Sequence, residues 1–330
     1  MEVNDEFKNL KILIAGCGSI GKRHASVLTS LGVSDIWAYD PSAEQLQSLI
    51  KESPGVKPCD SFEDGLANNP DAVFILTPTR LHIAAAIQAV KANCHVFLEK
   101  PLSDSLEGVD ELAGIAAENN KKVMVGFCFR YHEGLLKAKK LVQSGEIGRL
   151  VSIRALMGEH FPEVRPDYKK TYYAKYSGAF ELVHDLDLAI WFADRKVKNS
   201  YGVFGPFSDI GIEAPDTVEI LVEFEDRCAA TVHLDFFQIP RRRMIELIGT
   251  EGVLVVEFAS WDNYTLSIFN KRKNEWESST EATTRNDMFK AEDKEFLQAI
   301  VENKPIICGI EEARKSLEVV MSLQNRRITE

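Results

Sequence analysis

The segment GCGSIG at 16–21 has the glycine spacing of a dinucleotide-binding turn, and it follows the apolar run KILIA at 11–15. Gly16 permits a tight turn, Gly18 leaves room for a pyrophosphate, and Gly21 lets the following helix pack closely on a sheet. The free N–H groups at the start of that helix favour phosphate binding. Methyltransferases also have a glycine-rich first turn, so the assignment needs the acidic residue that comes next.

Asp40 stands directly after a second apolar run, DIWAY at 35–39. A carboxylate there can accept hydrogen bonds from the ribose hydroxyls of adenosine. It also repels the 2′-phosphate of NADP, and no Lys or Arg occurs in residues 41–43. The sequence therefore predicts NAD as the cofactor rather than NADP.

Polar residues follow two further apolar runs. In TPTRLH at 77–82, Thr77 and Thr79 could contact a phosphate or ribose of the cofactor. His82 could do the same, or it could only cap or orient the following helix, and the structural role is favoured. EKP at 99–101 follows HVFL and places a charged pair at the end of a buried strand, unless it is a surface turn with a proline.

These motifs need a sheet that brings them together, and the first half of the chain alternates strand and helix patterns. Right-handed crossovers place the carboxyl ends of parallel strands at one edge, where ligands bind. The predicted strands are 11–15, 35–39, 71–76, 95–98 and 122–126, and the predicted helices are 20–31, 43–50, 83–92 and 106–119.

The second half has closely spaced strands, which imply a mainly antiparallel sheet. If helices cover one face of that sheet, the other face should pack against another subunit. We therefore predict an α/β chain with a doubly wound Rossmann domain at 1–127. An α+β domain with an open, mainly antiparallel sheet at 128–330 would form a homo-oligomer, a dimer or tetramer. The predicted strands there are 217–224, 228–236, 244–248, 253–258 and 264–270, and the helices are 132–144, 179–192, 289–302 and 311–325.

The composition restricts the partners. The 330 residues include 50 acidic and 39 basic side chains, a net charge of −11, which argues against nucleic-acid binding. The dense basic cluster at 241–243 is interpreted as a solvated strand start or a subunit contact. No apolar run approaches the ~20 residues of a membrane span, and no export signal is visible, so we expect a cytoplasmic protein with six reduced cysteines. The cysteines form no CxxC pair, and no metal-binding cluster is visible.

GCGSIG, TPTRLH and above all EKP resemble the motifs of the Gfo/Idh/MocA family (glucose–fructose oxidoreductase, inositol dehydrogenase, rhizopine catabolism). The resemblance covers essentially the whole chain and includes GFCFR at 126–130, EIG at 146–148, a helix with His184, and GTEG at 249–252. It implies a Rossmann domain that binds NAD(P) and a second domain that supplies substrate contacts and the oligomer interface. It also implies a dehydrogenase acting on a secondary alcohol of a sugar, cyclitol or related polyol.

The resemblance further implies roles for single residues. Lys100 would be the catalytic-site lysine, Glu99 would lie against the nicotinamide ribose, and the Lys100–Pro101 peptide would be cis. His184 would be the histidine of the second domain. Glu181 stands three residues before it, where the common pattern has Asp four before, and both spacings lie on one helix face. The residues expected to bind the cofactor are Gly16, Gly18, Ser19, Ile20, Gly21, Asp40, Thr77, Thr79, His82, Glu99 and Lys100.

Oxidation of a secondary alcohol removes a proton from oxygen and a hydride from carbon, and nicotinamide takes the hydride. His184 suits the role of base, and Lys100 would stabilise the alkoxide and could exchange the proton. Glu181 or Asp187 could orient the imidazole. Without the resemblance, His184 would equally be a buried structural histidine.

Substrate contacts are expected from Lys100, Arg130, His160 and His184. Arg130 could bind a hydroxyl or a carboxylate. The stretch that begins at His160 could form a lid or a sugar pocket, and its aromatic members are Tyr168, Tyr172 and Tyr173.

Two other functions fit these motifs. One is a glycoside-cleaving enzyme that uses NAD catalytically: it oxidises a ring hydroxyl, eliminates the aglycone and re-reduces the product. The other is a non-catalytic NAD-binding regulator, against which the intact Lys100 and His184 argue. Steady NADH formation would distinguish a dehydrogenase from the glycoside-cleaving enzyme. Loss of function in Lys100→Ala would exclude the non-catalytic regulator.

Overall fold

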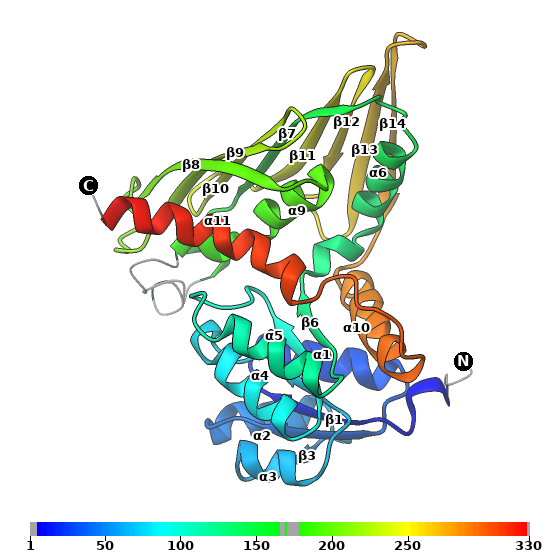
Figure 1. Ribbon diagram of the computed structural model, residues 1–330, viewed down its shortest axis with the longest axis vertical. Coiled ribbons are helices and arrows are strands. Elements are labelled where there is room, and N and C mark those ends of the chain that lie inside the picture. Colours follow the sequence, from blue (N-terminus) through cyan, green and yellow to red (C-terminus); the bar gives the residue numbers. More distant parts are fainter. Residues whose placement is uncertain (1–4, 166–168, 170–177, 329–330) are drawn as a thin grey trace. The chain divides into compact units, whose positions relative to one another are not determined.

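The computed structural model describes residues 5–165, 169 and 178–328. The chain forms two compact units, whose elements are labelled in Figure 1. Unit 1 comprises Met1–Cys128 and Asn286–Leu317, and unit 2 comprises Phe129–Arg285 and Glu318–Glu330. The tyrosines that we expected in a lid or pocket, Tyr168, Tyr172 and Tyr173, lie outside the described residues.

Unit 1 contains a six-stranded parallel sheet in the order β3-β2-β1-β4-β5-β6, which confirms the predicted Rossmann fold. Its central strands are buried along nearly their whole length, as expected for a parallel sheet with helices on both faces. The strands are β1 Lys11–Ala15, β2 Asp35–Tyr39, β3 Lys57–Pro58, β4 Ala72–Ile75, β5 His95–Glu99 and β6 Val123–Gly126. The helices are η1 Asp5–Phe7, α1 Ser19–Ser30, α2 Ala43–Glu52, α3 Phe62–Ala67, η2 Thr79–Leu81, α4 His82–Lys91 and α5 Val109–Glu118.

The position of the chain reversal in this sheet matters for ligand binding. The chain runs from β1 outward to β3 and then returns to place β4 on the other side of β1. A doubly wound sheet binds its ligand outside the carboxyl ends of the strands at such a reversal. The elements β3 and α3 were not predicted, because β3 has only two residues and both are exposed.

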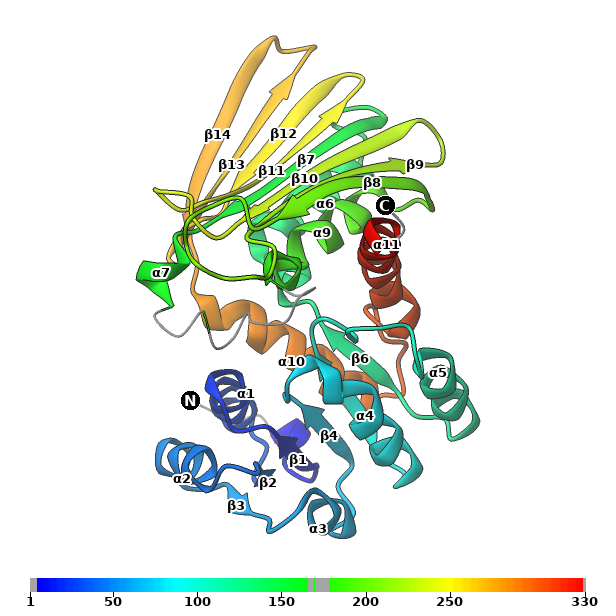
Figure 2. The same cartoon turned by 90° about the vertical axis from the view of Figure 1, so that its left-hand side faces the viewer.

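Helix α10, Arg285–Val301, corrects the predicted domain boundary. We assigned everything after residue 127 to the second domain, but residues 286–317 belong to unit 1. The physical reason is aromatic packing on the parallel sheet. The ring of Phe296 lies edge-on to Phe74 at 5.5 Å and to Phe97 at 5.7 Å, and α10 runs beside the labelled strands of unit 1 in Figure 2.

Unit 2 is built on an eight-stranded sheet in the order β14-β13-β12-β11-β7-β10-β9-β8. All neighbouring strands are antiparallel except β7 and β10, which are parallel, so the prediction of a mainly antiparallel sheet is confirmed. Strand β14 was not predicted, because it is exposed along most of its length and shows no apolar alternation. The strands are β7 Leu150–Gly158, β8 Val197–Gly205, β9 Thr217–Phe224, β10 Cys228–Asp235, β11 Arg242–Gly249, β12 Gly252–Glu257, β13 Asn263–Asn270 and β14 Glu275–Ala282.

Within unit 2, helices α6 and α9 cover one face of this sheet, as Figures 1 and 2 show. The predicted helix 179–192 is two elements, the 3-10 helix η4 Gly178–Leu182 and the α-helix α9 His184–Ala193. The remaining helices are η3 Cys128–Tyr131, α6 Glu133–Gln143, α7 Phe161–Val164 and α11 Ile310–Ile328, which the two units share. Across the described part of the chain, no helix is long and apolar enough to cross a membrane.

Candidate active site

The glycine loop has the geometry that its spacing predicts. Gly16 has a φ of +102°, and a Cβ on it would lie 2.5 Å from the carbonyl oxygen of Leu76. A Cβ on Gly21 would lie 2.1 Å from the carbonyl oxygen of Gly16. Both positions therefore exclude any side chain. Around the Cβ position of Gly18, in contrast, no atom lies within 4 Å, so space remains open at the start of α1.

The N-terminus of α1 offers donors to an anion. Its N-cap is Gly18, which supplies no side-chain cap. The first N–H groups of a helix have no intrahelical acceptor, and the helix dipole is positive there. The amides of Ser19 and Ile20 thus fit the pyrophosphate of a dinucleotide, as predicted.

Asp40 is held against this loop. One carboxylate oxygen accepts a hydrogen bond from the backbone N–H of Cys17 at 2.7 Å, and the other accepts from that of Ser42 at 2.8 Å. Each carboxylate oxygen has a second lone pair, which a ribose hydroxyl can use. Burial and the charge of Asp40 raise the pKa of the Cys17 thiol to about 12, so Cys17 stays protonated.

The turn after β4 contains an unsatisfied hydroxyl. Thr77 Oγ1 is buried and has no hydrogen-bond partner in the described part of the chain. Its backbone nitrogen lies 3.0 Å from the Cβ position of Gly16, so Thr77 adjoins the glycine loop. Since buried hydroxyls are normally hydrogen-bonded, this orphan fits a contact with the cofactor. Thr79, the second predicted contact, opens η2 beside it and is partly exposed.

His82 has the contacts of a structural residue, the role that the sequence favoured, and its contact with the cofactor stays a prediction. Its side chain is buried, and its two ring nitrogens lie 2.9 Å from the carbonyl oxygens of Thr77 and Pro101. Burial lowers the pKa of His82. The ring therefore ties the turn after β4 to the turn after β5 and presents no free nitrogen to a ligand.

Glu99 ends β5, and Lys100 follows it at the same sheet edge as the glycine loop. A carboxylate oxygen of Glu99 accepts a hydrogen bond from the backbone N–H of Lys100 at 2.9 Å. The Lys100–Pro101 peptide is cis, as the resemblance implied. Unit 1 thus brings together every predicted cofactor residue at the carboxyl ends of β1, β2, β4 and β5.

The other predicted site residues belong to unit 2. His184 is the first residue of α9, and its ring lies edge-on to Phe129 at 4.9 Å. Glu181 lies in η4, directly before α9, so the single helix that we expected over both residues is two elements, and the role of Glu181 stays a prediction. His160 is half-buried before α7, and its Nδ1 lies 3.3 Å from a carboxylate oxygen of Glu163.

Arg130 and Asp187 form a buried pair that corrects two expectations. The Nε and Nη2 groups of Arg130 donate to the two oxygens of Asp187 at 2.8 and 2.7 Å. Both side chains are at most 3% exposed. Asp187 therefore binds Arg130, a partner that we did not predict for it. Arg130 is part of the buried interior of unit 2, although we expected it to contact the substrate.

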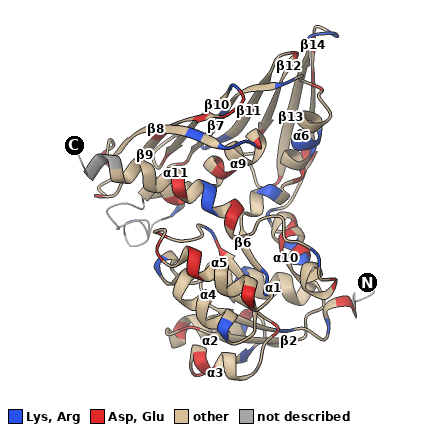
Figure 3. Ribbon diagram, viewed as in Figure 1, with Lys and Arg blue, Asp and Glu red and all other residues tan. Residues whose placement is uncertain are grey.

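The basic cluster at 241–243 is also only partly solvated. Acidic and basic residues are interspersed along the chain in Figure 3, and two of these three arginines have acidic partners. Arg243 is buried and donates to both oxygens of Asp185 at 3.1 and 2.6 Å, and its guanidinium lies 3.8 Å from the ring centre of Phe129. Nε of Arg241 lies 3.0 Å from Glu159. Asp185 and Asp187 lie in the otherwise apolar helix sequence HDLDLAIWFA. Two acids in such a sequence indicate buried cationic partners, a signal that the sequence analysis did not use.

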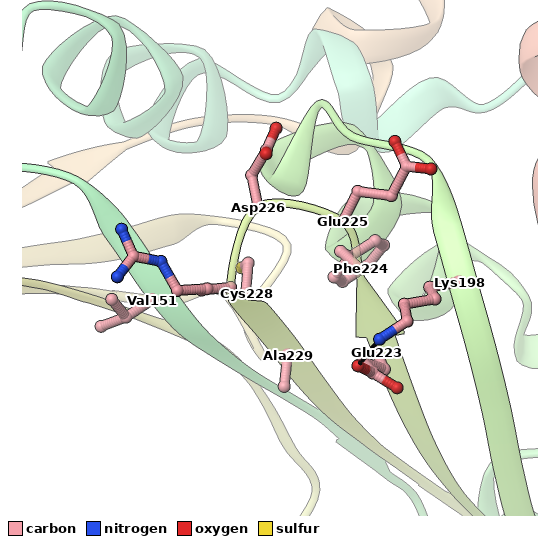
Figure 4. Close-up of a pocket in the computed structure, with 9 residues that line it drawn as sticks. Val151, Lys198, Glu223, Phe224, Glu225, Asp226, Cys228 and Ala229 are labelled. Atoms are coloured by element: carbon pink, nitrogen blue, oxygen red, sulfur yellow. Dashed lines mark hydrogen bonds and ion pairs between the residues drawn. The ribbon is translucent and has the colours of Figure 1, made fainter.

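A hollow of about 440 Å³ lies at the hairpin between β9 and β10 (Figure 4). It contains none of the predicted site residues. Lys198 and Glu223 on its wall are paired with each other at 2.7 Å. Burial raises the pKa of the Cys228 thiol, so it is not an activated nucleophile. The hollow therefore shows no arrangement for catalysis.

Comparisons with known proteins give the family of both parts of the chain. Residues 10–127 match the family model for the Gfo/Idh/MocA oxidoreductase family with an NAD-binding Rossmann fold, and residues 135–255 match that for the Gfo/Idh/MocA C-terminal domain. The chain is 25% identical over 235 residues to inositol 2-dehydrogenase of Corynebacterium glutamicum, covering 69% of this chain and 67% of that protein. It is 24% identical over 311 residues to inositol 2-dehydrogenase/D-chiro-inositol 3-dehydrogenase of Lacticaseibacillus casei, covering 90% and 86%.

A solved structure shows the same fold. Scyllo-inositol dehydrogenase from Lactobacillus casei, with bound NAD(H) and scyllo-inositol, matches with a TM-score of 0.82 over 96% of each chain at 24% identity. The family models together match more than half of the present chain. The chain therefore belongs to the Gfo/Idh/MocA family of oxidoreductases, and its Rossmann domain binds NAD.

Proposed function

We propose that this protein transfers a hydride between NAD and a secondary alcohol or ketone of a sugar, a cyclitol or a sugar derivative. The observation that carries the proposal is the position of Glu99 and Lys100 at the end of β5, at the same edge of the parallel sheet as the dinucleotide loop, with β4 between β5 and β1. Similarity to proteins named inositol 2-dehydrogenase supports a polyol as the substrate class.

Bound NAD supplies the hydride acceptor. In this proposal, Lys100 binds the reacting hydroxyl oxygen and stabilises the negative charge that develops on it. His184 takes the proton from that oxygen in oxidation and returns it in reduction. Glu181 keeps the candidate role of orienting His184, and His160 keeps that of a substrate contact.

The test is turnover of a panel of sugars and cyclitols with NAD, followed by NADH absorbance and product analysis. We expect NADH to accumulate in proportion to ketone. Lys100→Ala should lower the rate about 10²–10⁴-fold and leave NAD affinity within a few-fold, because it removes a group that acts on the reacting oxygen. Lys51→Ala, an exposed lysine on α2, is the control and should match the wild type.

Two outcomes would contradict the proposal. Product that forms from a glycoside without net NADH would show a cleaving enzyme that recycles NAD. NAD binding without turnover of any substrate, together with a biological function that survives Lys100→Ala, would show a regulator.

We also propose that the uncovered face of the unit 2 sheet joins copies of the chain into a homo-oligomer. Tyr201 and Leu221 are register partners on β8 and β9, and with Val203 they are about half or more exposed on that face. Exposed apolar side chains gathered on one face are typical of subunit contacts. Light scattering should give the mass of a dimer or tetramer, and a monomer mass at micromolar concentration would contradict this proposal.

A further inference from the structure

Helix α9 begins at His184, and its first turn contains two buried acids. The N-cap residue is Val183, which has no polar side chain to hold the free N–H groups of that turn. Asp185 and Asp187 stand in the same turn, and each is 1% exposed. Carboxylates are rarely buried to this degree unless they are paired. The first turn of α9 therefore depends on cationic partners from other elements of unit 2.

Each of the two aspartates meets one arginine through a fork of two hydrogen bonds. Nε and Nη2 of Arg243 on β11 donate to the two oxygens of Asp185 at 3.1 and 2.6 Å. Nε and Nη2 of Arg130 in η3 donate to those of Asp187 at 2.8 and 2.7 Å. Both guanidinium groups are at most 5% exposed. A planar guanidinium that meets both oxygens of a carboxylate fixes the relative direction of the partners as well as their distance.

The two pairs hold α9 from different sides. An α-helix turns by about 100° per residue, so Asp185 and Asp187 point in directions about 200° apart around the helix axis. Strand β11 therefore holds one side of the first turn, and η3 holds the other. A roll of the helix about its axis, or a shift along it, would break at least one fork and leave a buried charge without its partner, which is strongly unfavourable.

Phe129 connects the two pairs with the ring of His184. Phe129 precedes Arg130 in η3, and the guanidinium carbon of Arg243 lies 3.8 Å from its ring centre. The ring of His184 lies edge-on to that of Phe129, with the ring centres 4.9 Å apart and an interplanar angle of 76°. Edge-on contacts are a preferred geometry of aromatic pairs. The two pairs thus restrain the backbone at His184, and Phe129 restrains its ring.

The use of arginine matters beside a residue that exchanges a proton. A guanidinium stays protonated at every accessible pH. Each arginine–aspartate pair therefore keeps its hydrogen bonds whether the imidazole of His184 is neutral or cationic. The position of the first turn of α9 is thereby independent of the proton that a base gains and loses.

A contribution to stability alone does not account for this arrangement. Well-packed hydrophobic residues of similar volume often stabilise a fold as well as a buried ion pair does. A buried pair, in contrast, disfavours every displaced arrangement that would leave its charges unpaired. Two forks on one helical turn, which begins at His184, therefore specify the place of that residue more narrowly than apolar packing would.

We propose that Arg130 and Arg243 are positioning residues for the imidazole of His184. They act through the two aspartates in the first turn of α9 and through the ring of Phe129, and not by contact with the reacting atoms. The inference rests on the proposed function, in which His184 transfers the proton of the reacting hydroxyl. Arg130 thereby serves the site from the interior of unit 2.

The first experiment removes a fork and keeps its charge. Arg130→Lys retains a cation for Asp187, but an ammonium cannot reproduce the planar pair of donors. In the full-length protein, with saturating NAD and the polyol that the wild type turns over, kcat should fall about 10–100-fold, because a small misplacement of the base slows the reaction. Arg243→Lys should act in the same way. The dissociation constant of NAD should stay within about twofold, because the glycine loop and Asp40 belong to unit 1.

Two control variants separate position from stability. Arg154→Lys alters an exposed ion pair between β7 and β11 of the same unit. Leu254→Ala leaves a cavity in the core of unit 2 and lowers its stability. Leu254 lies on β12, and its register partner on β11 is Leu247. Both controls should keep kcat within about twofold of the wild type at a temperature well below unfolding.

Two results would overturn the proposal. One is a kcat of folded Arg130→Lys and Arg243→Lys within about twofold of the wild type. The other is an equal loss of kcat in folded Leu254→Ala, because the effect would then follow stability and not the position of His184.

A second measurement needs no turnover. In protein with ¹³C-labelled histidine, the ring signal of His184 is assigned by its absence in His184→Gln. This signal should shift or broaden in Arg130→Lys, because the ring leaves its place against Phe129, and it should stay unchanged in Leu254→Ala. An unmoved His184 signal in folded Arg130→Lys would overturn the proposal. An absence of polyol turnover, with the signal behaving as expected, would contradict the proposed function alone.

Discussion

The two units hold their buried charges in different ways. In unit 2, Arg130 and Arg243 each meet one aspartate through two hydrogen bonds. In unit 1, Nδ1 of the His24 imidazole lies 2.9 and 3.0 Å from the two oxygens of Asp293. A guanidinium stays charged at every accessible pH, whereas an imidazole and a buried carboxylate exchange protons near neutrality. The arginine pairs of unit 2 therefore keep their charges over the whole accessible pH range, whereas the charge of the His24–Asp293 pair in unit 1 depends on pH.

The largest effect should come from a broken arginine pair in unit 2. Arg243→Met leaves Asp185 buried without its cation, which should cost about 3–5 kcal/mol of unfolding free energy at any pH between 6 and 9. Urea unfolding followed by tryptophan fluorescence measures it, because Trp191, Trp261 and Trp276 all belong to unit 2. Arg242→Met, at an exposed neighbour, should change the free energy by less than about 0.5 kcal/mol. Equal effects of the two variants would show that the buried pair contributes nothing.

A smaller and pH-dependent effect is expected in unit 1. Asp293 raises the pKa of His24, so the pair stabilises the fold fully below the ordinary pKa of histidine, and this contribution is lost as pH rises through the raised value. Asp293→Asn should therefore cost about 1–3 kcal/mol near pH 6 and less near pH 9. Hydrogen exchange of α1, compared between wild type and variant at each pH, measures it. An equal cost of Asp293→Asn at pH 6 and pH 9 would contradict this expectation, because the His24–Asp293 pair would then behave like the arginine pairs of unit 2.

The smallest effect should come from a partly exposed histidine of unit 2. His233 on β10 has Nε2 at 2.8 Å from Asp235 and Nδ1 at 2.5 Å from Glu219. The hydrogen bond with Asp235, aided by Glu219, raises the pKa of His233 to about 9. Its contribution is present below about pH 6.5 and is lost as pH rises through 9.

Because the His233 side chain is 28% exposed, solvent should limit this contribution to about 1 kcal/mol or less. His233→Asn should flatten the urea-unfolding free energy of unit 2 between pH 6.5 and 9. Thr231→Ser, on the same strand, should keep the wild-type slope. If His233 contributed as steep a pH dependence of the unfolding free energy as the His24–Asp293 pair, burial would not explain the difference between the two histidines.

Much of the candidate site was predictable because its signals are local. GCGSIG must turn tightly and open a helix, and Asp40 follows a strand that pairs with the one before the loop. In a parallel sheet, residues that follow successive strands meet at one edge, so Thr77, Glu99 and Lys100 were located from spacing alone. The cis Lys100–Pro101 peptide and the role of His184 in the second half came instead through the family resemblance.

The partners of the buried charges were not predictable. His24 and Asp293 are 269 residues apart in the chain, and nothing in the pattern of α10 says which sheet it covers. Likewise, the sequence suggested a substrate contact for Arg130 and an orienting role for Asp187. Only the packing showed that the two side chains pair with each other.

The sequence by itself determined the Rossmann unit, its glycine loop and acidic residue, and the strand ends that carry Glu99 and Lys100, because short-range backbone geometry and strand periodicity specify them. Only the tertiary structure decided that α10 completes unit 1, that Arg130 is buried against Asp187, and that His24 faces Asp293. The physical reason is that the cost of burying a charge depends on its partner, and that partner is set by long-range packing.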